Sequence, residues 1–172
     1  HLYGDLLLPV HALGEQLLTL AQQSQDSAML VAAHRAFGTT LFLQGAAAEA
    51  HTHLAQGLAL YDLQQHRAYA FLYGEDAGVV CGSHDAWALW YLGYPDQGLA
   101  RSQEAVTLAQ QSAHPFSLSF ILSFSAVFHQ FRREMRLTQE RAEAAISLAK
   151  EQGFPLWVAY SSILRAWALV QG

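Results

Sequence analysis

Apolar side chains recur at intervals of three and four residues along most of this 172-residue chain. In the first stretch, Leu13, Leu17 and Leu20 follow this spacing, which places them on one side of a helix. No stretch shows the alternation of apolar and polar residues that indicates a half-buried β-strand. Glycine and proline separate the apolar segments where turns are expected. The pattern therefore predicts an all-α protein of about eight helices joined by short turns.

Local signals give the helix boundaries. Asp26 is a suitable N-cap, and Gly153 suits a left-handed C-terminal cap. Pro95 and Pro115 suit the first turn of a helix, and Pro155 starts the last one. The predicted helices span residues 6–23, 27–44, 46–64, 79–92, 95–112, 115–131, 137–152 and 155–171.

A sequence repeat organises the chain. The hexapeptide Thr-Leu-Ala-Gln-Gln-Ser stands at both 19–24 and 107–112, with looser copies at 59–62 and 147–150. Their leucines are 40, 48 and 40 residues apart, and a period of this size is typical of stacked helical repeats. We therefore expect antiparallel helix pairs that stack into a solenoid. The anchoring leucines are Leu20, Leu60, Leu108 and Leu148.

The longer interval of 48 residues contains eight extra residues. We expect them to form a protruding loop or an extended helix pair around 65–78. Long connections in compact arrays are more often functional than short ones, although a purely structural spacer is an equal alternative. The candidate binding residues of this insert are His66, Arg67, Tyr69, Tyr73 and Asp76.

Small side chains stand at matching places in three successive helix pairs, where they let the two helices approach closely. They are Gly38, Gly45, Ala50 and Gly57, then Ala86, Gly93, Gly98 and Ala105, then Ala126, Thr138 and Ala145. Proline follows the second and third pairs, and Arg133 replaces the turn glycine of the third. This arrangement resembles the tetratricopeptide repeat, which implies a right-handed superhelix.

The repeats are nearer 40 residues long than the usual 34. Gly-Tyr-Pro-Asp-Gln at 93–97, His-Pro-Phe-Ser-Leu at 114–118 and Glu-Gln-Gly-Phe-Pro at 151–155 are similar to repeats in bacterial signalling ATPases, including the maltose-regulator type. They look still more like the C-terminal repeats of large proteins that join a cyclase-like domain to an ATPase domain. The resemblance implies a regulatory or assembly role for a single repeat domain, 1–172, within a larger protein.

In a tetratricopeptide array the first helix of each pair lines a concave groove. We expect residues around Trp87 to face this groove, and the positions one repeat before and one repeat after them to face it as well. An aromatic groove with one arginine would suit an apolar peptide, although Trp87 and Trp90 could equally pack in the core. The candidate groove residues are Arg35, Thr39, Phe42, Ser83, Trp87, Trp90, Tyr91, Ser123, Val127 and Gln130.

Composition narrows the possible partners and the compartment. The formal net charge is −5 and the only basic cluster is Arg132, Arg133 and Arg136, which argues against a nucleic-acid surface. The run 115–131 lacks charged residues but is too polar for a comfortable membrane span. Cys81 is the only cysteine, so a reducing, cytoplasmic location is expected, with this residue buried.

Catalytic motifs are missing from the sequence. No Gly-rich phosphate loop or His-Glu-x-x-His motif occurs, and His51 and His53 diverge on a helix. The consecutive Ser83, His84 and Asp85 diverge by about 100° each, so they cannot form a local triad. We therefore expect no enzyme activity, metal or cofactor, and instead a scaffold that binds a peptide or partner domain. The alternative is a sensor of a small effector that regulates an attached ATPase or cyclase domain.

The last predicted helix is apolar around its whole circumference, because residues such as Leu156, Ile163 and Trp167 project in different directions. Packing on the preceding pair cannot bury all of these side chains. A solenoid needs polar capping faces at its ends. We therefore expect self-association through the terminal helices.

Overall fold

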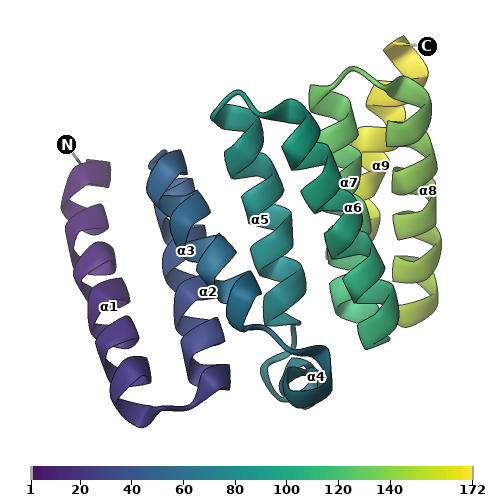
Figure 1. Cartoon of the computed structure of the whole chain (residues 1–172). Helices are drawn as coiled ribbons and strands as arrows, with labels where there is room; N and C mark the ends of the chain where they lie inside the picture. Colours follow the sequence, from purple (N-terminus) through teal and green to yellow (C-terminus); the bar gives the residue numbers. More distant parts are fainter. Residues whose placement is uncertain (1, 172) are drawn as a thin grey trace.

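The computed structural model describes residues 2–171, and the side chains of residues 11–171. Within this part of the chain there are nine helices and no strand, so the all-α prediction is confirmed (Figure 1). The helices are α1 (Leu2–Ser24), α2 (Ser27–Leu43), α3 (Ala47–Leu60), α4 (Leu63–Tyr73), α5 (Ala77–Tyr91), α6 (Pro95–Ser112), α7 (Pro115–Phe131), α8 (Met135–Gln152) and α9 (Pro155–Gln171).

Three helix pairs form the body of the array: α2 with α3, α5 with α6, and α7 with α8. The first helices contact one another in the order α2, α5, α7, and α9 continues this layer. Each second helix also packs against the first helix of the following pair, as α3 does on α5 and α8 on α9. Because these first helices run in the same direction, their N-terminal ends lie on one side of the array (Figure 1).

The insert is a ninth helix, which the sequence prediction missed. Helix α3 ends at Leu60 rather than continuing to residue 64, and α4 follows after two residues. Asp62 caps α4 by accepting a hydrogen bond from the Gln65 amide at 3.0 Å. Gly74, with a φ of 82°, ends it in the left-handed region that favours glycine. The extra residues therefore form a short separate helix, neither a protruding loop nor an extension of the pair.

Helix α4 lies across the N-terminal side of the array, where it is seen nearly end-on in Figure 1. At one end of this helix, His66 Nε2 is 3.1 Å from the Ser27 hydroxyl at the start of α2. Further along, the Phe71 ring meets the His114 ring edge-on, with centroids 4.9 Å apart, at the start of α7. Helix α4 thus bridges the first and third pairs of the array.

Turn and cap residues support the predicted boundaries. The Asp26 carboxylate accepts hydrogen bonds from the amides of Ala28 and Met29, as expected of the N-cap of α2. Gly93 has a φ of 86° in the turn between α5 and α6. Arg133, which takes the place of that glycine in the next pair, also has a positive φ, 56°. The backbone therefore makes the same turn with a less suitable residue.

Small residues do bring the helices of a pair together, as the repeat pattern predicted. A Cβ atom added to Gly38 of α2 would lie 2.7 Å from the Leu54 side chain of α3. One added to Gly98 of α6 would lie 2.8 Å from the Ala86 carbonyl oxygen of α5 and 2.9 Å from the Phe128 ring. At these two contacts only glycine fits without displacement of its neighbours.

Cys81 is fully buried, as expected, and contacts the core cluster between α2, α3 and α5. Burial raises the pKa of its thiol to about 12. A thiol with such a pKa is protonated near neutral pH and is a poor nucleophile. The side chain therefore behaves as a small apolar core residue.

Candidate functional site

A row of aromatic rings crosses the layer of first helices. Phe42 of α2 lies 6.0 Å from Trp87 of α5, measured between ring centroids. Trp87 stacks on Phe124 of α7 at 4.4 Å, with 5° between the planes, and Phe124 stacks on Tyr160 of α9 at 6.2 Å. All four rings are only half-buried. These four residues, called the aromatic row below, form an accessible apolar strip across four helices.

Two further rings extend this strip towards the C-terminal ends of the helices. Tyr91 of α5 lies 5.8 Å from Phe42 and 6.3 Å from Phe131, and its side chain is 65% exposed. Phe131 also contacts Trp90, whose ring meets the buried Phe128 edge-on. Trp87 and Tyr91 therefore face solvent in part, whereas Trp90 packs partly against the core.

Three of the predicted groove residues lie inside the protein. Ser83 is buried within α5, and Val127 is buried in a cluster with Ala142 and Leu164. The buried Ser123 hydroxyl lies 2.8 Å from the hydroxyl of Ser161. A shift by one repeat from Trp87 leads to Val127, but the ring beside Trp87 belongs to Phe124, one helical turn earlier. The exposed strip therefore differs from the predicted groove at these positions.

The other predicted groove residues divide between two places. Phe42, Trp87 and Tyr91 come together around the aromatic row, as described above. Thr39 and Gln130 are half-buried, and the Thr39 hydroxyl has no hydrogen-bond partner among the described residues. Arg35 lies about two turns before Phe42 on α2 and lines a separate cavity.

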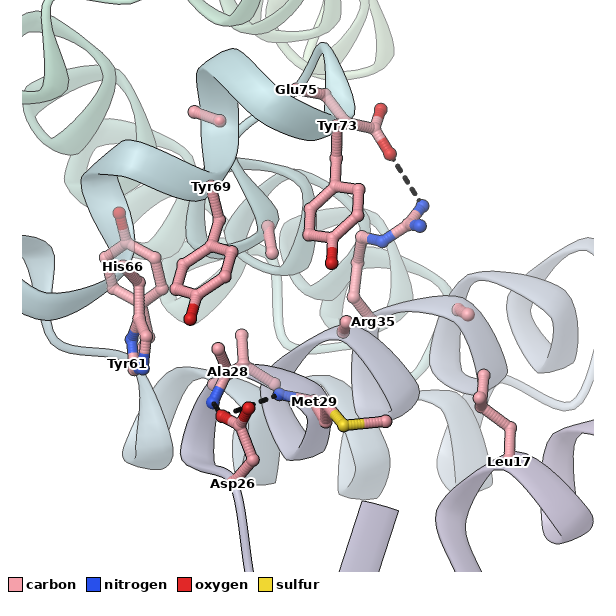
Figure 2. A pocket seen from close by; sticks show the side chains of 15 residues that line it. Leu17, Asp26, Ala28, Met29, Arg35, Tyr61, His66, Tyr69, Tyr73 and Glu75 are labelled. Carbon is pink, nitrogen blue, oxygen red and sulfur yellow. Dashed lines mark hydrogen bonds and ion pairs between the residues drawn. The ribbon is translucent and has the colours of Figure 1, made fainter. Parts of the chain in front are cut away.

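That cavity has a volume of about 550 Å³ and lies between α2 and α4, with α1 and the start of α5 at its edges (Figure 2). A volume of this size is in the range of small-molecule sites. Its lining combines aromatic rings, short aliphatic side chains and a few charged groups. The lining residues are Leu17, Asp26, Ala28, Met29, Val31, Ala32, Arg35, Ala36, Tyr61, His66, Tyr69, Ala70, Tyr73, Glu75 and Ala77.

One wall of the cavity is aromatic and the facing wall is aliphatic. Tyr61, His66 and Tyr69 form a chain of ring contacts, with centroids 5.4 and 6.5 Å apart. Tyr69 and Tyr73 then lie nearly parallel, 6.0 Å apart and with 7° between their planes. Figure 2 shows both tyrosine side chains directed from α4 towards α2, where Met29 lies among the alanines.

The charged groups of the cavity stand at its rim. Arg35 Nη1 pairs with Glu75 Oε1 at 2.7 Å (Figure 2). Asp26 uses Oδ1 to cap α2 and remains exposed. His66 Nδ1 accepts a hydrogen bond from the Asp62 amide at 2.9 Å. Two carboxylates and one guanidinium therefore stand at the rim of the cavity.

The structure brings together residues that the sequence assigned to two different surfaces. His66, Tyr69 and Tyr73 of the predicted insert line the same cavity as Arg35 of the predicted groove. Arg67 is exposed and is not among the lining residues. Asp76 is buried, where its carboxylate accepts hydrogen bonds from the Val79 amide and the Tyr61 hydroxyl. Asp76 therefore has a structural position, because it caps α5.

Met29, Tyr61 and Glu75 line the cavity but were not among the candidate site residues. The sequence carried a partial signal for Glu75, since it lies within the insert. Met29 and Tyr61 could be found only with knowledge of how α4 folds back over α2.

His84 and Asp85 bond to different parts of the protein, and the buried Ser83 hydroxyl has no hydrogen-bond partner among the described residues. His84 Nδ1 is 3.0 Å from the Val80 carbonyl oxygen, within its own helix. The fully buried Asp85 carboxylate accepts from His51 Nδ1 at 2.6 Å and pairs with Arg101 Nε at 2.9 Å. Burial raises the pKa of Asp85, and these two partners oppose that effect. The resulting network ties α3, α5 and α6 together.

Within residues 11–171, no cluster of three or more histidine, cysteine, aspartate or glutamate side chains has the geometry of a metal site. No helix in the described part of the chain is both long and apolar enough to cross a bilayer. A scan against models of known protein families gives no match to this chain, and neither does a search of curated proteins.

Four buried or half-buried histidines make stability depend on pH. Burial lowers the pKa of His34, His53, His84 and His114, and the 3.2 Å contact between the Nδ1 atoms of His34 and His53 requires one of them to be unprotonated. The unfolded chain therefore binds protons first, near the ordinary histidine pKa of about 6.5. We expect the melting temperature to fall as pH decreases from about 7.5 to about 5.5.

Melting curves at closely spaced pH values test this expectation. Replacing His84 by glutamine should make the melting temperature depend less steeply on pH, because one of the four histidines with a lowered pKa is then absent. A melting temperature that stays constant over this interval would contradict the prediction.

Proposed function

We propose that the chain is a non-catalytic interaction module that binds an apolar segment of a partner protein along the aromatic row. The observation that carries the proposal is the row itself, in which Phe42, Trp87, Phe124 and Tyr160 are half-exposed on four different helices. Large aromatic side chains dominate the energetics of protein interfaces. A surface contributed by several repeats is also the usual binding surface of a solenoid.

The spacing of the rings favours a helical segment as the occupant. Neighbouring centroids along the row are 6.0, 4.4 and 6.2 Å apart. Side chains three or four residues apart on a helix surface are separated by about 5–6 Å. An amphipathic helix lying along the row could therefore place successive apolar residues against successive rings, in the manner of helix-in-groove recognition.

Selection from a displayed random peptide library tests this proposal directly. We expect enriched peptides with apolar residues at intervals of three and four. Their affinity, measured by fluorescence anisotropy, should fall about fivefold or more in Tyr91→Ala. This substitution removes an exposed ring and should leave the fold intact.

Phe71→Ala is the matched control, because Phe71 is similarly exposed but lies on α4, away from the row. It should bind the selected peptides like the wild-type chain. The absence of any enriched peptide, or equal losses in both variants, would contradict the proposal.

A second candidate function is effector sensing, in which a small molecule binds the cavity between α2 and α4. The specific observation that favours it is a volume of about 550 Å³ enclosed by residues of α2 and the inserted helix. A ligand held between these elements would stabilise one position of α4 over the array. Such a module could regulate an attached ATPase or cyclase domain.

We also expect the chain to self-associate through α9. One stripe of this helix is buried, including Trp157 and Leu164, but the opposite side remains apolar and exposed. Covering such a side removes apolar surface from water. The exposed residues are Leu156, Ile163, Leu169 and Val170, each more than half exposed.

Light scattering at micromolar concentration should give a mass above that of one chain. Ile163→Asp should restore the monomer, whereas Ser162→Asp, which places the charge at a neighbouring exposed position, should perturb association less. A monomeric wild-type chain at this concentration would refute the expectation.

A further inference from the structure

We propose that the cavity between α2 and α4 binds an organic cation with a flat apolar body. This site is separate from the proposed peptide-binding surface, because no residue of the aromatic row lines the cavity. It names the chemistry of an effector for the second candidate function. Three observations carry it: the shape of the two walls, the balance of charges at the rim and the free tyrosine hydroxyls.

The shape of the cavity suits a flat molecule. The rings of Tyr69 and Tyr73 are nearly parallel, with centroids 6.0 Å apart, and both line the α4 side of the cavity. Met29 and short alanine side chains form the opposite side, which leaves room for an inserted ring. Contacts between a methionine sulfur and an aromatic ring are favourable. A flat apolar body would therefore stack on the tyrosines and contact Met29 with its other face.

The charges favour a cation. Asp26 and Glu75 are both at the rim, and Arg35 is the one guanidinium among the lining residues, already paired with Glu75. Asp26 is thus a carboxylate without an opposite charge in the described cavity lining. Tyrosine faces also attract cations through the ring quadrupole. An anionic ligand would meet the Asp26 carboxylate, which is hydrogen-bonded to two amides of α2 but has no counterion, and the only lining guanidinium is already paired with Glu75.

The polar groups of the wall are available to a ligand. Neither the Tyr69 nor the Tyr73 hydroxyl forms a hydrogen bond with another described side chain, whereas the Tyr61 hydroxyl is bound to Asp76. Tyr73 is also well exposed, so the cavity is open to solvent on this side. A ligand can therefore enter between α2 and the second half of α4 without displacing a core side chain.

The test uses three small probes of similar size and different charge: benzyltrimethylammonium, benzyl alcohol and phenylmethanesulfonate. Binding to the full chain is followed by two-dimensional amide NMR. We expect saturable shifts at residues 28–36 and 66–75 with the cation, about tenfold weaker binding of the neutral alcohol, and no saturable binding of the sulfonate. Equal binding of the sulfonate and the cation, or no saturable shift with the cation, would overturn the proposal.

Charge variants separate recognition of a cation from simple apolar binding. Asp26→Asn keeps an N-cap residue on α2 but removes the charge, and it should weaken binding of the cation several-fold. Arg35→Gln releases Glu75 from its ion pair and should strengthen binding. If neither variant changes the affinity, the cavity recognises only apolar surface and the proposal fails.

Ring variants locate the site. Tyr69→Ala should weaken binding of the cation about tenfold, whereas Tyr69→Phe, which keeps the ring face, should bind nearly as well as wild type. Leu72→Ala is the matched control, because Leu72 is exposed on α4 but does not line the cavity. Equal losses in Tyr69→Ala and Leu72→Ala would overturn the assignment. Tyr91→Ala should bind the cation normally. The proposal of a cation site and the proposal of peptide binding along the aromatic row can therefore fail independently.

Discussion

Replacing Phe128 by alanine is expected to lower the free energy of unfolding by about 3–5 kcal/mol, the range for removing a fully buried phenylalanine ring. The side chain is 0% exposed and its ring packs closely against Gly98 of the neighbouring pair. It also meets Trp90 edge-on at 5.7 Å. Alanine would leave a cavity where α5, α6 and α7 meet, and rigid helices collapse only partly into such a space. Urea denaturation measures the loss.

Phe131→Ala is the matched control, since it removes the same ring from a half-buried position of the same helix. Its loss should be clearly smaller. Gly98→Ala tests the same contact from the other side, because its new methyl group would crowd the Phe128 ring and the Ala86 carbonyl. Equal losses in the free energy of unfolding for Phe128→Ala and Phe131→Ala would show that packing where α5, α6 and α7 meet has no special importance for stability.

Replacing Asp76 by alanine is expected to cost about 2–4 kcal/mol, because a lost N-cap and a buried hydroxyl without a partner both destabilise the folded state. The Asp76 carboxylate is 1% exposed. It caps α5 through the Val79 amide at 3.1 Å and accepts from the Tyr61 hydroxyl at 2.8 Å. Burial and this carboxylate together raise the pKa of Tyr61, so the hydroxyl stays protonated as a donor. Thermal and urea unfolding report the change.

Two other substitutions identify the cause. Asp76→Asn keeps an oxygen for the cap and for the hydroxyl, so it should cost much less. Tyr61→Phe removes the donor, and Asp76→Ala in that background should cost less than it does alone. Additive losses in the double variant would mean that the two side chains act independently.

The repeat pattern was sufficient to predict the helical array, because its signals are local. Asp26 and Gly153 act at helix ends through backbone contacts within a few residues, and the structure confirms both. Gly38 and Gly98 were recognised by their place in the repeat, and each permits a close contact in the structure.

Helix α4 was missed because its boundary depends on contacts that are distant in sequence. Residues 46–64 read as one continuous helix, rich in alanine. The chain turns at Tyr61 instead, whose hydroxyl is held by Asp76 fifteen residues later. Asp62 then caps a new helix. A local pattern cannot show such a contact.

The candidate surfaces were predicted only in part for a related reason. Repeat spacing located Trp87 and Tyr91 on an accessible face, but it selected the buried Val127 where Phe124 takes the place beside Trp87. The cavity depends on the distance between α2 and α4, which no spacing along the chain specifies.

The bridge formed by α4 has a mechanical consequence. A stacked array of helix pairs bends by small rotations of each pair relative to its neighbours. Helix α4 reaches from Ser27 to His114 and therefore acts as a brace across the first three pairs. Its attachments include one hydrogen bond and one ring contact, each worth about 1 kcal/mol, and the packing of the buried His66 and Ala70. We therefore expect α4 to detach at a lower free-energy cost than the unfolding of a paired helix. Once α4 has detached, the array should bend more easily.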